Sequence, residues 1–156
     1  MDRAAICLEV ALPASHPGFT ADVAAATRWF GTLFVRALGE LGLEAALAAE
    51  NSQPAEGLAA QACFASWVRG EVLMSSRKVF GTAQYRRRGG ALFQGVGLSR
   101  GSHARVAAVL AGDSQARRDA VAAIERASVA VQGVPGEELG DAIRRSVSRA
   151  SIGFST

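Results

Sequence analysis

The sequence has 156 residues and a mass of 16.2 kDa, which is the size of one domain with its own hydrophobic core. Hydrophobic residues make up 49% of the chain and charged residues 20%, so the composition is globular rather than disordered. The formal net charge is only +3, and charges interrupt every apolar run before it reaches the roughly 20 residues of a membrane span. We therefore expect one domain over residues 1–156 and no membrane segment.

Cysteine and histidine are scarce. Cys7 and Cys63 are the two cysteines, neither lies in a CxxC motif, and the chain has two histidines. These numbers are too small for a disulfide framework and argue against a structural zinc site, so we expect no metal. The apolar run after Met1 is too short for a secretory signal, and we expect a cytoplasmic protein.

The basic residues are unusual because 16 of the 17 are arginine and one, Lys78, is lysine. The arginines are scattered except for the triplet at 86–88. Nucleic-acid binding requires arginines gathered on one face, and one triplet beside one tyrosine is a weak signal for it. We expect no nucleic-acid partner.

The first half of the chain predicts a strand and a long helix. Residues 4–11 (AAICLEVA) are apolar and predict a strand, which we expect in the centre of a sheet. Thr20 is the expected helix N-cap, and Gly42 the expected end of the helix. Residues 43–49 could form a short strand. The expected helix carries one broad apolar stripe, made of Val23, Ala26, Trp29, Phe30, Leu33, Phe34, Ala37, Leu38 and Leu41.

The centre of the chain predicts sheet. Residues 71–74 predict a short strand, and residues 78–86 alternate between apolar and polar side chains, as in a half-buried strand. Residues 88–90 (RGG) predict a hairpin turn that leads into a return strand over residues 91–98. Glycines 81, 95 and 97 lie inside these strands, where glycine often marks a bulge or the close approach of a ligand or backbone.

Helical patterns return after residue 102. One helix is expected near residues 106–110, a second over 114–125 and a third over 137–150, which begins acidic and ends basic as the helix dipole favours. The order of elements predicts an α+β fold in two layers, with a mixed, largely antiparallel sheet packed with helices.

Lys78 and Gly81 are the candidates for chemistry in the central segment. A lysine that begins a strand can stabilise an acyl oxygen, a phosphate or a developing oxyanion. The backbone at Gly81 can approach a bound chain closely, because glycine has no Cβ. The alternative is a surface lysine beside a tight hairpin.

The same segment resembles the catalytic domain of lipoate–protein ligases, biotin–protein ligases and octanoyltransferases. Residues 76–84 read SRKVFGTAQ and are followed by YRRRGGALFQ. The lipoate branch of that family has the pattern G-[RK]-K-[IVL]-x-G-[ST]-A-Q, followed by arginine-rich residues and a strand that ends in Q-H-G-[ST]. The flanking segments are similar too, so the resemblance covers nearly the whole chain, as the later two-thirds of such a domain.

The resemblance implies roles for individual residues. The lysine at the position of Lys78 contacts the carbonyl of the activated acyl group. A cysteine near the position of Cys63 forms an acyl-thioester in one subgroup of octanoyltransferases, and the alternative for Cys63 is a small buried hydrophobic residue. A thiolate near an ammonium would have a lowered pKa. Replacement of Lys78 by alanine is expected to abolish transfer and leave folding nearly intact. Substrate binding is implied for Gly81, Thr82, Ala83, Gln84, Arg86 and Gln94.

The chain departs from the family pattern at two places. The motif R-R-x-[TS]-G-G-G-x-x-x-H, which forms a wall of the acyl site, is absent, and the sequence begins just after its expected place. Gly95 stands where the Q-H-G-[ST] segment has histidine. Three interpretations are open: a truncated enzyme, one subunit of a split enzyme, or a homologue that has lost catalysis.

The resemblance predicts an acyltransferase that moves an octanoyl or lipoyl group to a lysine of a lipoyl-domain protein. The expected partners are lipoyl-domain or glycine-cleavage carrier proteins and an acyl carrier protein, with self-association or a partner subunit as a further expectation. No covalently bound cofactor is expected, and ATP and Mg²⁺ would be needed only by a ligase. The alternative is a non-catalytic homologue or a partner subunit of a split lipoate–protein ligase.

Overall fold

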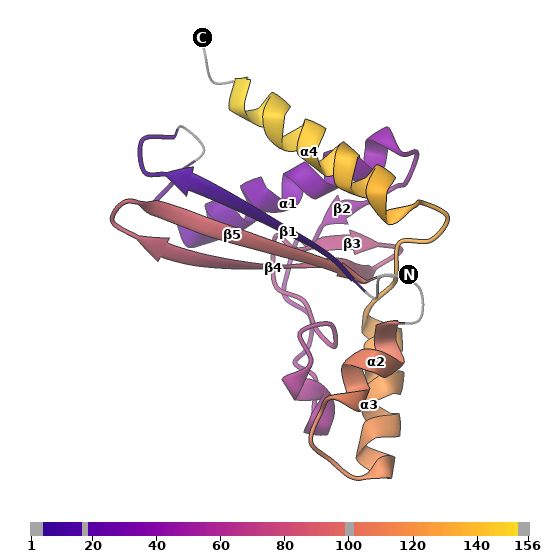
Figure 1. Cartoon of the computed structure of the whole chain (residues 1–156). Helices are drawn as coiled ribbons and strands as arrows, with labels where there is room; N and C mark the ends of the chain where they lie inside the picture. Colours follow the sequence, from indigo (N-terminus) through magenta and orange to yellow (C-terminus); the bar gives the residue numbers. More distant parts are fainter. Residues whose placement is uncertain (1–4, 17–18, 99–101, 153–156) are drawn as a thin grey trace.

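The computed structural model describes residues 5–16, 19–98 and 102–152 (Figure 1). It has an α+β fold, as the order of predicted elements indicated. The elements in chain order are β1 (Ala5–Pro13), α1 (Val23–Glu40), β2 (Ala46–Leu47), the 3₁₀ turn η1 (Gly57–Gln61), β3 (Val72–Met74), β4 (Arg77–Arg87), β5 (Gly90–Leu98), α2 (Ser102–Ala108), α3 (Ser114–Ala127) and α4 (Gly136–Ile152).

The five strands form one sheet in the order β1-β5-β4-β3-β2, and every neighbouring pair is antiparallel. The prediction that β1 is central was wrong, because β1 pairs only with β5 and lies at the edge. Its burial alternates, with Val10 and Leu12 buried and Glu9 and Ala11 exposed. One buried face explains the apolar composition of β1 without a second neighbouring strand.

The β4–β5 hairpin was predicted closely, and it places the residues of the candidate site. Its turn is Arg88–Gly89, and the register runs from Arg87 opposite Gly90 to Phe80 opposite Gly97. Gly90 must be glycine here, because a Cβ would lie 2.2 Å from the carbonyl oxygen of Leu12 in β1. The hairpin and the edge strand therefore pack together at this glycine.

Helix α1 supplies the main packing layer on one face of the sheet. Most of the predicted stripe is buried, including Phe30, Leu33 and Phe34, whereas Val23 is 54% exposed. The N-cap is Asp22 rather than Thr20: the Asp22 carboxylate accepts from the backbone N–H of residues 24 and 25 at 2.8 and 3.0 Å. The helix ends before Gly42, at φ +74°, as expected.

Two hydrophobic clusters lie on opposite sides of the sheet. Helices α1 and α4 lie together over one face, and α2 and α3 lie on the other side near the end of β5 (Figure 1). Glu40 at the end of α1 bonds Arg145 at 3.2 Å and Arg149 at 2.5 Å in α4. Among the described residues, no helix combines the length and the apolar character needed to cross a membrane.

Candidate functional site

Lys78, the second residue of β4, is buried. The residue is 3% exposed, so the interpretation of Lys78 as a surface lysine was wrong. Its ammonium lies 2.8 Å from the Oε2 atom of Glu71, a carboxylate that is itself buried, and both side chains are about one-twentieth exposed or less. Buried charges are tolerated in proteins when they are paired and hydrogen-bonded, and this pair meets both conditions.

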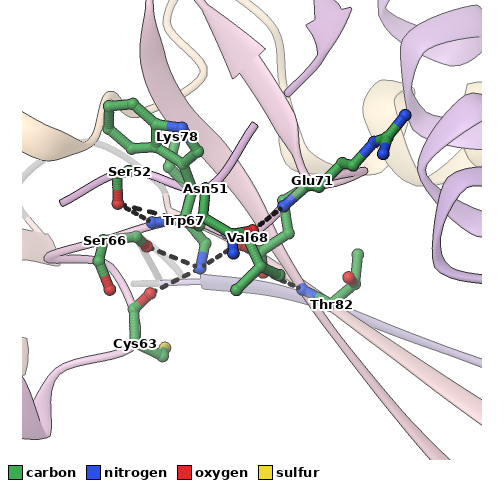
Figure 2. Close-up of polar contacts among 10 residues, drawn as sticks. Asn51, Ser52, Cys63, Ser66, Trp67, Val68, Glu71, Lys78 and Thr82 are labelled. Atoms are coloured by element: carbon green, nitrogen blue, oxygen red, sulfur yellow. Dashed lines mark hydrogen bonds and ion pairs between the residues drawn. The ribbon is translucent and has the colours of Figure 1, made fainter. Parts of the chain in front are cut away.

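The Lys78 ammonium has an acceptor for each of its three N–H groups. Besides the Glu71 carboxylate, it donates to the carbonyl oxygens of Cys63 at 2.6 Å and Ser66 at 3.2 Å. Figure 2 shows these three contacts converging on the nitrogen. The Phe64 ring lies 5.4 Å from the same nitrogen, within range of a cation–π interaction.

Glu71 joins three segments of the chain. Its Oε2 atom also accepts from the backbone N–H of Val68 at 3.0 Å, and its Oε1 atom accepts from the N–H of Thr82 at 3.0 Å. Sequence reasoning placed residue 71 at the start of a strand, in one of the flanking segments similar to the family, and did not predict these contacts. The available signal was a carboxylate beside an apolar strand, seven positions before the single lysine.

The loop that carries Cys63 and Ser66 is held by its own hydrogen bonds. The Ser52 hydroxyl accepts from the N–H of Trp67 at 2.8 Å, and the Ser52 N–H donates to the Trp67 carbonyl at 2.9 Å. Asn51 accepts from the N–H of Arg69 at 2.8 Å. Figure 2 shows these contacts beside the Lys78 ammonium. The chain is therefore held directly after Ser66, one of the two residues whose carbonyl oxygens meet Lys78.

Cys63 is a free cysteine and an exposed residue, so it is not the buried hydrophobic residue of the alternative interpretation. Its carbonyl oxygen faces the ammonium, and its sulfur lies on the other side of the residue (Figure 2). Partial burial raises the pKa of the Cys63 thiol above its ordinary value; the Lys78 charge lowers it and the Glu71 charge raises it further. The expected fall in the thiol pKa is contradicted, because burial and Glu71 outweigh the ammonium.

Gly81 and Thr82 lie beside the Lys78–Glu71 pair. A Cβ at Gly81 would lie 3.1 Å from the Lys78 Cε and 3.7 Å from the Glu71 Oε1. Glycine at this position thus leaves room for the buried pair. The Thr82 N–H bonds Glu71, and the buried Thr82 hydroxyl has no partner among the residues that the structure describes.

Gln84 and Arg86 lie toward the other end of β4 and contact the start of α1. The Gln84 amide donates to the Val23 carbonyl at 3.0 Å and to the Thr27 hydroxyl at 2.9 Å. Arg86 donates to the Gln84 side chain at 2.8 Å and to the carbonyl of Thr20. These two polar side chains are therefore engaged in fastening α1 to the sheet.

Ala83 and Gln94 are paired across β4 and β5 on the face opposite α1. Both are exposed, and Gln94 donates to Glu9 of β1 at 2.6 Å. Because side chains alternate along a strand, Gly81 lies on the same face. The structure thus brings Gly81 and Thr82 to the lysine, places Ala83 and Gln94 farther along the sheet, and engages Gln84 and Arg86 with α1.

A family profile described as the lipoyl protein ligase A/B catalytic domain matches residues 1–135. The chain belongs to this family. A search of curated protein sequences finds no match.

Solved structures of lipoate ligases share the fold of this family member. A Thermoplasma acidophilum bi-partite lipoate protein ligase, described with its E2 lipoyl domain, has 19% identity and a TM-score of 0.65. A lipoate-protein ligase A bound with ATP has 17% identity and a TM-score of 0.61. A third structure, a T. acidophilum protein with bound lipoic acid, has 18% identity and a TM-score of 0.57. In each case the match covers 92% of this chain and 49% of the other, so the chain spans about half their length.

Gly95, where the chain departs from the lipoate-branch pattern, packs directly against an aromatic ring of the core. A Cβ at Gly95 would lie 2.3 Å from the Cζ atom of Phe34, and one at Gly97 would lie 2.3 Å from the Cε1 atom of Phe80. Both aromatic side chains are fully buried. The glycines inside β5 therefore accommodate core aromatic rings from α1 and β4, and a side chain at position 95 would enter that layer.

Proposed function

We propose that this chain is an acyltransferase of lipoate metabolism, which moves an octanoyl or lipoyl group through a thioester on Cys63 to a lysine of a lipoyl-domain protein in the cytoplasm. The observation that carries the proposal is the contact between the buried Lys78 ammonium and the backbone carbonyl of Cys63, in a member of the lipoyl ligase catalytic-domain family. A cation is thereby fixed next to the residue that bears an exposed thiol.

The proposed reaction has two acyl transfers. In the first, the Cys63 thiolate attacks the carbonyl carbon of an acyl thioester on a carrier protein; a new carbon–sulfur bond forms and the carrier thiolate leaves, taking up a proton. In the second, the neutral amine of the target lysine attacks the same carbon and expels the Cys63 thiolate, which receives the proton lost by the amine. Lys78 stabilises the negative charge that develops on the acyl oxygen in both steps.

The remaining site residues take different parts in this proposal. Gly81 and Thr82 lie beside the Lys78–Glu71 pair and would border the reacting carbonyl, and Ala83 and Gln94 lie on the exposed sheet face along which an acyl chain would extend. Gln84 and Arg86 support substrate binding by holding the start of α1 against β4.

A ligase reaction is the variant of this proposal that requires ATP and Mg²⁺. Structures with the same fold are described with bound ATP and with bound lipoic acid. Transfer is favoured here because a ligase needs no thiol, whereas this chain carries one next to the lysine. Dependence of lipoyl-domain modification on ATP separates the two reactions.

The second candidate function is a non-catalytic homologue or a partner subunit of a split ligase. Three acceptors already surround the Lys78 ammonium, so an acyl oxygen would have to displace one of them to reach it. This observation favours the second candidate. A bi-partite ligase is also among the structures with this fold. A partner chain would in this case supply the glycine-rich motif.

Intact mass after incubation with octanoyl-loaded carrier protein tests the proposal. One octanoyl group should be retained by the wild-type chain and by Cys7→Ser, which removes the other exposed cysteine, and should be absent in Cys63→Ser. Addition of a lipoyl domain should then discharge the adduct. If no adduct forms and no lipoyl domain is modified, the chain has no transferase activity by itself and the second candidate is favoured.

A further inference from the structure

Glu71 is the centre of a buried polar cluster that no motif in the sequence identifies. Its two oxygens together receive three donors: the Thr82 N–H on one oxygen, and the Val68 N–H and the Lys78 ammonium on the other. The side chain is 5% exposed. The carboxylate is therefore held in one orientation by backbone groups of β4 and of the loop before β3.

The three donors explain why this position needs a carboxylate rather than an amide. Each oxygen of an ionised carboxylate accepts hydrogen bonds, whereas the side chain of glutamine has one acceptor and one NH₂ donor. A glutamine at position 71 would direct its NH₂ either at the Thr82 N–H or at the Val68 N–H and the ammonium. Either arrangement would also leave the buried Lys78 charge without its counter-ion, because glutamine is neutral.

Glu71 acts on the position of Cys63 indirectly, through its contact with Lys78. The carboxylate fixes the ammonium, and the ammonium in turn holds the carbonyl oxygens of Cys63 and Ser66 at 2.6 and 3.2 Å. We infer that Glu71 is a positioning residue for acyl transfer, which sets the place of the Lys78 ammonium and, through it, of the backbone that carries the Cys63 thiol. This inference rests on the proposed function.

The cluster also indicates how an acyl oxygen reaches the ammonium. The Ser66 carbonyl is the most distant of the three acceptors, so it is the one that an incoming acyl oxygen replaces. The Glu71 and Cys63 contacts then remain, and the ammonium keeps its place during the exchange. Without Glu71 the ammonium would lose the one charged partner that it has among the described residues and would turn with the substrate.

The single lysine makes the inference testable by NMR. In the full chain labelled with ¹⁵N-lysine, Lys78 gives the one side-chain ammonium signal, and its protons exchange slowly while they are buried and hydrogen-bonded. We expect Glu71→Gln to shift this signal or to broaden it by fast exchange. The matched control Glu50→Gln changes an exposed glutamate for which no contact is described, and the signal should stay as in the wild type.

Kinetics of octanoyl transfer from carrier protein to lipoyl domain supply the second measurement. We expect kcat of Glu71→Gln to fall about 100-fold with little change in KM, because misplacement of a catalytic group by about 1 Å has an effect of this size. If Glu71→Gln does not fold, Glu71→Asp keeps the charge with a shorter reach and should show the same two changes to a smaller degree.

The outcomes separate this inference from the proposed function. An unchanged ammonium signal in the Glu71 variants, or a changed signal with unchanged kcat, contradicts the positioning role. If the wild-type chain transfers no acyl group, the proposed function fails and the inferred role in transfer fails with it. The ammonium signal would then still show whether Glu71 orders Lys78, so the two failures are recognised separately.

Discussion

The Nζ atom of Lys78 lies 2.6 Å from the carbonyl oxygen of Cys63, so the two residues proposed for acyl transfer are in direct contact although 15 positions separate them in the sequence. The contact uses the backbone of Cys63 rather than its thiol. Lys78 therefore fixes where the thiol-bearing turn lies, while the sulfur stays free to react. The ion pair with Glu71 makes this contact part of the folded core.

Replacement of Lys78 by methionine should destabilise the protein, in contrast to the sequence-based expectation that folding stays nearly intact. The change leaves the Glu71 carboxylate buried without its counter-ion, and the loss of one partner of a buried pair costs about 3–5 kcal/mol. Chemical denaturation measures the free energy of unfolding. The double variant Glu71→Leu/Lys78→Met should recover part of the loss, because it removes both charges but leaves the N–H groups of Val68 and Thr82 without the carboxylate. Equal instability of the single and double variants would contradict this explanation.

Alkylation of Cys63 should be slow at neutral pH and should accelerate as the pH rises. The thiolate is the reactive form, and burial raises the pKa of this thiol, so less thiolate exists at a given pH than for a free cysteine. Iodoacetamide labelling of Cys7→Ser, followed by intact mass from about pH 7 to about pH 10, gives the apparent pKa.

Two variants should move the pKa of Cys63 in opposite directions. Glu71→Gln removes a negative charge that raises this pKa, so the apparent pKa should fall; Lys78→Met removes a positive charge that lowers it, so the apparent pKa should rise. The exposed Glu50→Gln is the control and should leave the profile in place. Shifts of the same sign in both variants would mean that altered burial, not charge, dominates.

The sequence located Lys78 and Cys63, but not the geometry that joins them. The register of β3 against β4 shifts between Val72 and Leu73, so that Val72 lies opposite Phe80 and Leu73 opposite Lys78, and no residue pattern marks that shift. Two of the three lysine acceptors are backbone carbonyls, which any residue type can supply. The contribution of Glu71 was not evident because two of its three donors are backbone N–H groups, which the residue types do not reveal.

The fold was predicted from the periodicity of apolar residues. Its errors occur where tertiary contacts determine the position of a cap or a strand. Helix α1 and the β4–β5 hairpin were found because their apolar spacing is long and regular. The N-cap at Asp22 rather than Thr20 depends on which side chain reaches two free N–H groups. The edge position of β1 depends on strand pairing, since an apolar strand with one buried face resembles a central one.

Replacement of Gln84 by alanine should reduce stability more than it reduces substrate binding. The Gln84 side chain bonds Val23, Thr27 and Arg86, and each such hydrogen bond contributes about 0.5–1.5 kcal/mol. Denaturation and the KM for octanoyl carrier protein are the two measurements. A large rise in KM with unchanged stability would instead indicate direct substrate contact.

Gln94→Ala is the matched control for Gln84→Ala, because it removes the same side chain from the next strand. Gln94 is exposed and bonds the Glu9 carboxylate. We expect a smaller loss of stability, since an exposed donor and acceptor regain bonds to water. If Gln94 lies along the path of the acyl chain, as proposed, KM should rise more in this variant than in Gln84→Ala.

Replacement of Gly95 by alanine should destabilise the core. The new Cβ would lie 2.3 Å from the Cζ atom of Phe34, a fully buried ring at the centre of the α1 layer, and overpacking of this kind costs about 1–3 kcal/mol. The free energy of unfolding is the measurement. Gly39→Ala in α1 is the control, because its Cβ would meet no atom within 4 Å and alanine favours helix by about 1 kcal/mol.

A double-mutant cycle separates the ring contact from other effects at Gly95. Phe34→Leu shortens the side chain that the new methyl group would meet, so Gly95→Ala should be less destabilising in the Phe34→Leu background than in the wild type. Contacting residues commonly show interaction energies of about 0.5–3 kcal/mol in such cycles. Additive losses would contradict the proposed clash and would mean that another constraint requires glycine at position 95.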